Sequence, residues 1–478
     1  MRKKIFLAVL AAVLWALPSG ARITMSPLFS DGMVLQQRSN VRIWGFTDRD
    51  ARVSLSTSWD GKLYTCKPAP NGSWALSLPT PEAGGPYSIT IDDGDKTVIR
   101  DVKIGEVWIC SGQSNMEMKI KGFPGQPVEK AADYILEAGD YDIHAFTLSR
   151  SASNTTLTTC VGKWGKSSLA SVPEISAVAY LFARRIQSAL KVPVGIIISA
   201  WGGTSILGWM PEKVIDGCIS GAEKEAVLKS CGTPKDQPGV LYNGMIAPIA
   251  GYGARGFVWY QGEANVATPG TYGKLLSAMV PAWRQAWGDK KGEMPFFAVE
   301  IAPYRYGRGN DAKYDRPLTV EATAKALASV PNTGIATTGD VGNAVVIHPA
   351  AKKQVGDRLA FLALKNTYGF RDFNCDPPAI KKIEFIKGCA RIYPKGEDIA
   401  SEAVLYGFEL AGKDECYYDA KAVVARRDGY IEVSSPDVPE PIALRYGFHN
   451  WCRQNWANWL GIPALPFRTD KWDYTEEH

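Results

Sequence analysis

Several features that define common classes of protein are missing from this sequence. The 478 residues contain no Cys-x-x-Cys pair, no Walker A motif and no Gly-x-Ser-x-Gly motif. These absences argue against a zinc or dithiol site, a phosphate-binding loop and the nucleophile elbow of α/β-hydrolases. The net charge is only +5, with Lys and Arg scattered along the chain. We therefore expect no nucleic acid partner.

Long apolar runs are also scarce, and the one at the N-terminus has the pattern of a signal peptide. Arg2, Lys3 and Lys4 precede an apolar run over residues 5–17, and small residues at 19–21 suit cleavage after Ala21. The run is short for a bilayer, so a membrane anchor is the weaker alternative. We expect residues 1–21 to be a signal peptide, with no membrane span in the mature chain. The protein would then be secreted or periplasmic, where disulfides are permitted, although the nine cysteines leave at least one thiol unpaired.

Hydrophobic periodicity divides the rest of the chain into three parts. Alternating apolar residues and frequent turns predict an N-terminal β-sandwich domain over 22–101. Short apolar strands that alternate with amphipathic helices predict a three-layer α/β/α domain with a parallel sheet over 102–377. Alternation then returns, which predicts a β-rich, sandwich-like region and tail over 378–478.

Polar loops follow four of the predicted parallel strands, at 111–115, 199–205, 261–265 and 339–348. Ligands of an open parallel sheet bind beyond the carboxyl ends of its strands. The four loops supply a hydroxyl, backbone N–H donors, a side-chain amide and an imidazole. These groups are the ones that a serine esterase needs.

Ser114 is a better candidate nucleophile than Ser111, because it stands where the turn should enter a helix. There its own N–H and the helix dipole help to stabilise an oxyanion. The alternative is an ordinary helix N-cap. Only four histidines are present, and His348 alone follows a predicted α/β strand and precedes a helix. Gln261 and the Gly202-Gly203 pair complete a candidate oxyanion hole, with a plain turn as the alternative for the glycines.

The motifs together resemble the sialate O-acetylesterase family of SGNH/GDSL-type carbohydrate esterases. The matching segments are "SGQSNME", "WGGTSI", "VWYQGEAN" and "IHPAAKKQVGDRLA", and "SDGMVLQQ", "LYNGMIAP" and "PFRTD" extend the resemblance over nearly the whole mature chain. The resemblance implies Ser114 as nucleophile, His348 as general base, and oxyanion donors from the Ser114 N–H, the Gly203 N–H and Gln261. It also implies an SGNH-like parallel sheet with β-sandwich appendages, and removal of acetyl groups from sugar hydroxyls without a metal or cofactor.

The sequence departs from the family at the acid that should orient the histidine. SGNH enzymes usually carry an aspartate three residues before the histidine, and relatives often have one two before, but here both positions are valine (Val345 and Val346). Asp340 is one replacement, as the third catalytic residue. Asn343 or a backbone carbonyl is another, which would leave a Ser-His dyad. Weak or altered activity is the third possibility.

The main hypothesis is an exported enzyme that acts on an O-acetylated sugar or glycan, with sialate the favoured substrate. An esterase for acetylxylan or another polysaccharide is the alternative within the same class. A non-catalytic glycan-binding protein is the alternative from a different class, because the missing acid weakens the case for catalysis. The sequence contains 15 tryptophans, which suit sugar stacking and core packing equally well. Neither the oligomeric state nor the pairing of cysteines follows from the sequence.

Overall fold

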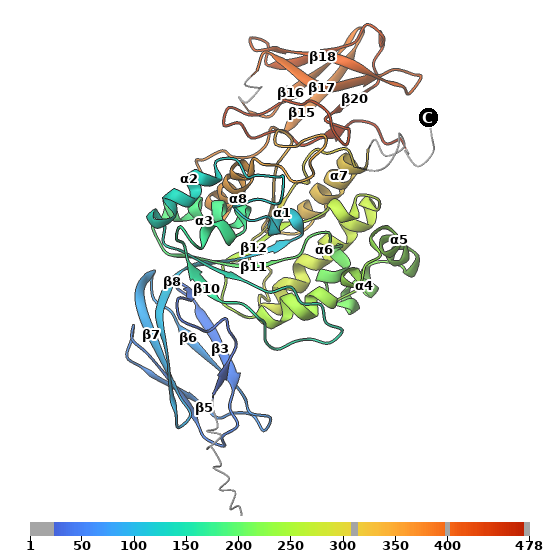
Figure 1. Ribbon diagram of the computed structural model, residues 1–478. Helices are drawn as coiled ribbons and strands as arrows, with labels where there is room; N and C mark the ends of the chain where they lie inside the picture. Colours follow the sequence, from blue (N-terminus) through green and yellow to red (C-terminus); the bar gives the residue numbers. More distant parts are fainter. Residues whose placement is uncertain (1–22, 307–313, 397–401, 473–478) are drawn as a thin grey trace, which may run out of the picture.

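A computed structural model of the chain describes residues 23–306, 314–396 and 402–472. A central α/β part lies between two β-rich parts at opposite ends of the molecule (Figure 1). The expected signal peptide, residues 1–21, lies outside the described residues. Among the described residues, no helix is long and apolar enough to cross a membrane.

The N-terminal strands pair antiparallel, as their alternating pattern predicts, except β2, which pairs in parallel with β8. The alternate apolar residues of the third and fourth strands, Val41, Ile43, Val53 and Leu55, are all buried. The Asp93-Gly94 step forms the predicted hairpin, since Asp92 pairs with Lys96 across it. The strands are β1 (Thr24–Met25), β2 (Val34–Gln36), β3 (Asn40–Phe46), β4 (Val53–Thr57), β5 (Leu63–Cys66), β6 (Ser73–Pro79), β7 (Gly84–Asp92) and β8 (Lys96–Gly112).

Strand β8 joins the N-terminal part to the central part without a linker. Its first half pairs antiparallel with β7, and its second half pairs in parallel with β11 and β12. The expected domain boundary between residues 101 and 102 therefore falls inside one 17-residue strand. The end of β8, where Ser114 follows, is thus held by the central sheet.

The central sheet has the order β10-β9-β11-β8-β12-β13-β14, and all of its strands except β10 run parallel. Its strands are β9 (Ile143–Thr147), β10 (Trp164–Lys166), β11 (Val194–Ala200), β12 (Gly256–Tyr260), β13 (Phe296–Val299) and β14 (Thr333–Ala336).

Helices cover both faces of this sheet. Alternate residues of β12 show this, because Phe257 and Trp259 belong to one apolar core while Val258 and Tyr260 belong to another. Helices α3 and α8 pack on one side, and α6 and α7 pack on the other (Figure 1). The helices are α1 (Ser114–Glu117), α2 (Ala131–Leu136), α3 (Ala177–Leu190), α4 (Glu212–Cys218), α5 (Gly221–Cys231), α6 (Pro269–Ala286), α7 (Asp315–Ala328) and α8 (Lys352–Asn366).

The C-terminal part is an antiparallel sheet of the order β15-β16-β19-β18-β17-β20-β21. The chain then returns to the central part, where Gln454 Nε2 donates to Gly339 O at 3.0 Å and Tyr304 N donates to Asn450 O at 2.9 Å. The strands are β15 (Ile380–Ile386), β16 (Cys389–Pro394), β17 (Val404–Ala411), β18 (Tyr417–Ala425), β19 (Tyr430–Ser434), β20 (Ala443–Tyr446) and β21 (Phe467–Arg468). The mixed α/β fold with a β-rich C-terminal part thus agrees with the expected fold class.

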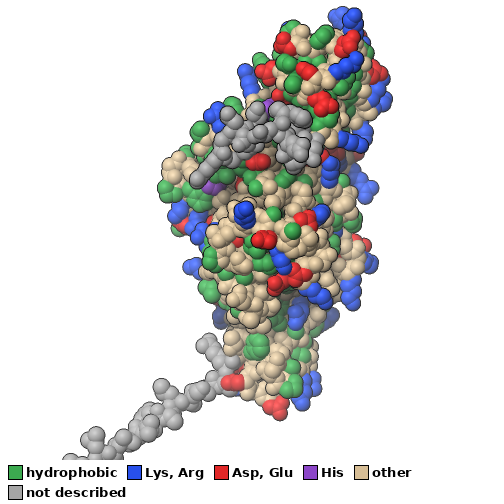
Figure 2. All heavy atoms as spheres, turned by 90° about the vertical axis from the view of Figure 1, so that its right-hand side faces the viewer, with side chains coloured by type: hydrophobic (Ala, Val, Ile, Leu, Met, Phe, Trp, Pro, Cys, Tyr) green, Lys and Arg blue, Asp and Glu red, His purple; other side chains and the backbone are tan. Residues whose placement is uncertain are grey.

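The described residues contain neither a disulfide nor a candidate metal site. All nine cysteines lie within the described residues, and none forms a disulfide. In the same residues, no group of three or more His, Cys, Asp and Glu side chains is placed to hold a metal ion. Acidic and basic side chains are interspersed on the face shown in Figure 2.

Candidate active site

Ser114 begins helix α1 directly beyond the carboxyl end of β8, as predicted. The turn before it requires glycine, because Gly112 has a φ of +143° and an added Cβ would lie 2.1 Å from Tyr260 O. Gln113 N also donates to Tyr260 O at 2.9 Å. The start of α1 is therefore fixed against the ends of β8 and β12.

The loop after β11 packs directly on Ser114. Trp201 N donates to Gly112 O at 3.0 Å. An added Cβ on Gly202 would lie 3.1 Å from Ser114 Cβ. The N–H of Gly202 donates to Glu117 Oε2 on helix α1 at 2.9 Å. The two loops that the sequence assigns to one site therefore lie against each other.

Two of the three predicted oxyanion donors are available. Neither the Ser114 N–H nor the Gly203 N–H has an acceptor within residues 23–306, 314–396 and 402–472. Gly203 lies in the left-handed region with a φ of +65°, which glycine adopts without strain. Both N–H groups can therefore donate to a bound group.

Gln261, the third predicted donor, is engaged elsewhere. Its side chain is buried, and its Nε2 donates to Thr204 O at 3.0 Å and to Asn265 Oδ1 at 2.7 Å. A primary amide has two N–H donors, so Gln261 has none left in this arrangement. The predicted role would require one of these bonds to break.

His348 lies in the irregular segment between β14 and α8. Its Nδ1 lies 2.7 Å from Gln126 Oε1, and the Phe123 ring meets the imidazole edge-on with centroids 5.0 Å apart. Because a carbonyl oxygen only accepts, Nδ1 carries the proton and Nε2 keeps its lone pair. Burial, assisted by the positive charge of Lys352, lowers the pKa of His348 to about 4.

Asp340, the candidate third catalytic residue, is bound by an arginine. Both of its carboxylate oxygens bind the Arg358 guanidinium, at 2.7 and 2.6 Å. Asn343 Oδ1 instead accepts the N–H groups of Val345 and Val346. The bidentate pair satisfies the carboxylate of Asp340, and the side-chain oxygen beside His348 Nδ1 is Gln126 Oε1.

Asn115 ties the serine loop to the histidine loop. Its Nδ2 donates to Ile347 O, next to His348, at 3.2 Å and to Glu263 Oε1 at 2.5 Å. Its Oδ1 accepts from Lys352 Nζ at 2.5 Å. Burial raises the pKa of Glu263 and lowers the pKa of Lys352 to about 7. This buried network brings three of the four predicted loops together.

Sequence reasoning assigned no role to four residues that build the site. Asn115, Glu117 and Lys352 stand within the motifs that carry the family resemblance, and this position was their only signal. Gln126 had none, because it lies in an irregular loop 222 positions from the histidine that it contacts. Only the fold identifies that pair.

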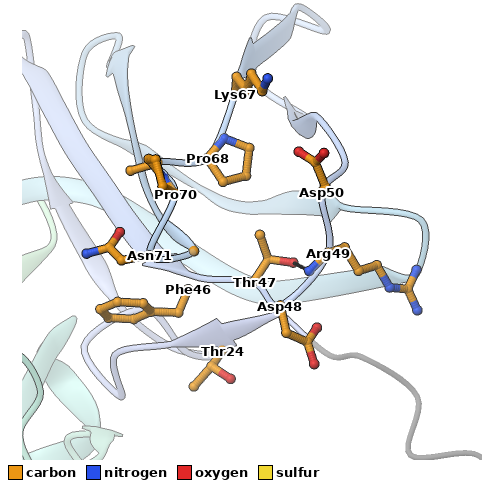
Figure 3. Close-up of a pocket in the computed structure, with 12 residues that line it drawn as sticks. Thr24, Phe46, Thr47, Asp48, Arg49, Asp50, Lys67, Pro68, Pro70 and Asn71 are labelled. Atoms are coloured by element: carbon orange, nitrogen blue, oxygen red, sulfur yellow. Dashed lines mark hydrogen bonds between the residues drawn. The ribbon is translucent and has the colours of Figure 1, made fainter.

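Two pockets differ in their relation to these residues. A pocket of about 990 Å³ lies in the N-terminal part (Figure 3), lined by residues such as Phe46, Asp48 and Pro70 and by no histidine. A second, of about 530 Å³, is lined by Phe123 and Glu117 among others. Phe123 contacts His348 and Glu117 binds Gly202. The smaller pocket therefore adjoins the candidate active site, and the larger one does not.

Comparison with known proteins places the chain in a family. A sequence profile described as "carbohydrate esterase, sialic acid-specific acetylesterase" matches residues 104–365. The sialate O-acetylesterase of Homo sapiens is 27% identical over 411 residues, which cover 79% of this chain and 77% of that protein. The enzyme of Rattus norvegicus is likewise 27% identical, over 74% of this chain and 75% of its own.

A solved structure matches nearly the whole chain. It is a carbohydrate acetylesterase from Xanthomonas citri, with 32% sequence identity and a TM-score of 0.83. The match covers 94% of this chain and 100% of that one. The alternative of a non-catalytic glycan-binding protein is therefore set aside. The chain is an esterase and belongs to the sialic acid-specific acetylesterase family of carbohydrate esterases.

Proposed function

We propose that this protein is an exported O-acetylesterase with an SGNH-type three-layer fold, which cleaves acetyl esters on sugar hydroxyls through an acetyl-enzyme on Ser114. The observation that carries this proposal is the contact between the serine and histidine loops. Asn115, directly after Ser114, donates to the backbone oxygen of Ile347, directly before His348. The predicted nucleophile and base thus come from segments that are hydrogen-bonded to each other.

In the proposed reaction, His348 Nε2 takes the proton of Ser114 Oγ as that oxygen attacks the acetyl carbonyl. The N–H groups of Ser114 and Gly203 donate to the oxyanion of the tetrahedral intermediate. The histidine proton then passes to the leaving sugar oxygen, and the C–O ester bond breaks. His348 then deprotonates a water molecule, which attacks the acetyl-enzyme. The C–O bond to Ser114 breaks, His348 returns the proton to Ser114 Oγ, and acetate leaves.

Gln126 takes the orienting part of the role that a carboxylate plays in a catalytic triad. Its carbonyl oxygen accepts the Nδ1 proton of His348 and so keeps the productive tautomer. An amide carries no negative charge, and it stabilises the imidazolium less than an aspartate would. The proposed machinery is therefore a Ser-His dyad with an amide partner.

Sialate is the favoured substrate because of the pocket beside the site. Lys119, Lys121 and Arg150 line it together with Glu117 and Glu174. Lys119 and Lys121 both pair with Glu174, and Arg150 pairs with Glu117, which leaves one positive charge in excess. This excess suits a sugar that itself carries a carboxylate. A neutral acetylated polysaccharide would gain nothing from this excess of positive charge.

The nucleophile is tested by a matched pair of serine variants. We expect Ser114→Ala to lower kcat for an aryl acetate by about 10⁴-fold or more, with an unchanged circular dichroism spectrum. Ser111→Ala is the control, because the Ser111 Oγ donates to Ser199 O at 2.6 Å. Its loss should cost about 1 kcal/mol of stability and little activity. Turnover retained by Ser114→Ala would refute the assignment.

The substrate and the export are tested separately. Acetate release from O-acetylated sialic acid should exceed release from acetylxylan, and Lys119→Met/Lys121→Met should lose activity only on sialate. Equal loss on both substrates would remove the argument for an acidic sugar. The mature protein should begin at Arg22, as N-terminal sequencing of the secreted or periplasmic fraction would establish.

A further inference from the structure

The peptide that joins Gly202 to Gly203 is bound at its carbonyl oxygen, and the peptide before it is bound at its N–H. Lys235 Nζ donates to Gly202 O at 2.6 Å, and the Gly202 N–H donates to Glu117 Oε2 at 2.9 Å. Arg150 in turn binds Glu117 Oε1 at 2.5 Å. Every polar atom of Gly202 therefore has a charged partner.

The orientation of this peptide decides where the Gly203 N–H points. The carbonyl of Gly202 and the N–H of Gly203 belong to one planar unit, and in a trans peptide they point in opposite directions. A peptide between two glycines meets few steric barriers to rotation of the whole unit. If it turned over, a carbonyl oxygen would replace the N–H and repel an oxyanion. A contact that fixes Gly202 O therefore also fixes the Gly203 donor.

Lys235 reaches Gly202 from a short turn that is itself anchored to the same loop. The turn is the 3₁₀ segment η4 (Pro234–Asp236). Asp236 is fully buried, and its Oδ1 accepts the N–H of Ser205 at 2.7 Å. Its Oδ2 accepts from the Thr233 hydroxyl at 2.5 Å. Neighbouring residues of one turn thus bind two points of the loop that contains Gly202 and Gly203.

We propose that Lys235 is a positioning residue for the esterase reaction, which locks the Gly202–Gly203 peptide with its N–H facing the acetyl oxygen. The inference rests on the proposed function, in which the Gly203 N–H is an oxyanion donor. A charge-assisted bond to Gly202 O is stronger than a neutral one. It also polarises the peptide, which makes the Gly203 N–H a better donor. Among the described residues, no hydrogen bond joins Lys235 to Ser114 or His348, so its proposed effect passes through the peptide.

The test uses three variants of the mature chain. Lys235 Nζ lies 5.8 Å from the Trp201 ring centroid, and Lys235→Met removes this donor while it keeps an unbranched side chain one atom shorter. We expect kcat for an aryl acetate to fall about 10- to 100-fold, less than the loss of a whole oxyanion donor can cost, with KM changed less than about threefold. Lys235→Arg restores a cationic donor and should recover part of kcat.

Lys224→Met is the matched control, because Lys224 Nζ binds Asp216 Oδ1 at 2.5 Å on the surface of helices α4 and α5. It should keep the parent kcat. Affinity for a phenylboronic acid, which forms a tetrahedral adduct with an active-site serine, should fall with kcat in Lys235→Met. An unchanged kcat, or a raised KM with kcat intact, would overturn the inference. The proposed function itself fails only if Ser114→Ala stays active, so the two failures are distinguishable.

Discussion

The serine side and the histidine side of the candidate active site are held in different ways. On the serine side, Ser114 starts a helix, and the loop at Gly202 is bound by Glu117 and Lys235. On the histidine side, residues 341–350 form neither helix nor strand. There His348 contacts the amide oxygen of Gln126 and the phenyl ring of Phe123. Val345, three residues before the histidine, is largely exposed.

The difference shows where a rigid arrangement matters most to an esterase. Oxyanion donors act through a fixed direction, so the elements around Ser114 gain from being bound at many points. A general base must change its protonation state, so its surroundings set a pKa as well as a position. Substitutions on the serine side should therefore lower kcat, while substitutions around His348 should move the pH profile.

The largest effect is expected from replacing Asn115, which connects the serine loop to the histidine loop through its hydrogen bond to Ile347 O. Asn115→Ala leaves the buried Glu263 carboxyl and the Lys352 amine without their shared partner. We expect the free energy of unfolding in urea to fall by about 3 kcal/mol or more, with activity lost as well. Asn71→Ala, at an exposed turn where Asn71 accepts the Ser73 N–H, should cost about 0.5 kcal/mol. Equal stability of the two variants would show that the hydrogen bonds of Asn115 to Glu263, Lys352 and Ile347 do not stabilise the fold.

An intermediate effect is expected from adding a charge on the histidine side. The base must be neutral, and a pKa of about 4 for His348 keeps it neutral at pH 6 and protonates it below pH 4. The parent kcat/KM should therefore fall only on the acid side, with its midpoint near pH 4. In Gln126→Glu, a carboxylate beside Nδ1 favours the imidazolium, so the midpoint should rise by about one pH unit or more.

Gln126→Met is the control for this shift, since it removes the acceptor without adding charge. It should lower kcat/KM and leave the acid midpoint near its parent value. A profile of Gln126→Glu that superimposes on the parent would mean that Gln126 does not face the base during catalysis.

The smallest effect is expected at Asp340, the residue that the sequence offered as the catalytic acid. Asp340→Asn weakens the pair with Arg358, which also donates to Thr337 O and Gly461 O. Because the Asp340 side chain is 40% exposed, the loss should be about 1 kcal/mol or less. Activity should stay within about threefold of the parent. A loss of 10³-fold or more in a folded variant would return Asp340 to the catalytic machinery.

The sequence predicted several strands of the sheet, although not β9 or β10, because buried parallel strands have a distinctive pattern. The run of Val and Ile before Ser199 and the aromatic run before Gln261 are β11 and β12. Placing residues at the carboxyl ends of such strands also brought Ser114, Gly203, Gln261 and His348 to one edge. This step used only topology, so it did not depend on loop conformation.

Side-chain partners were predicted poorly, because they depend on how irregular loops fold. Gln261 has the chemistry of an oxyanion donor, yet its amide binds Thr204 and Asn265. Asp340 has the chemistry of a catalytic acid, yet a buried arginine takes it. In both cases the side chain has the functional group that the predicted role needs, but it forms hydrogen bonds with other residues of the fold instead.

By itself, the sequence determined the α/β architecture, the position of Ser114 at a helix start and the family of the enzyme. Each of these follows from local periodicity or from contiguous motifs, which a linear chain displays directly. Only the tertiary structure decided that Gln126 faces His348 and that Lys235 holds Gly202 O. These contacts join loops that are distant in sequence, and their geometry arises only when the sheet brings those loops together.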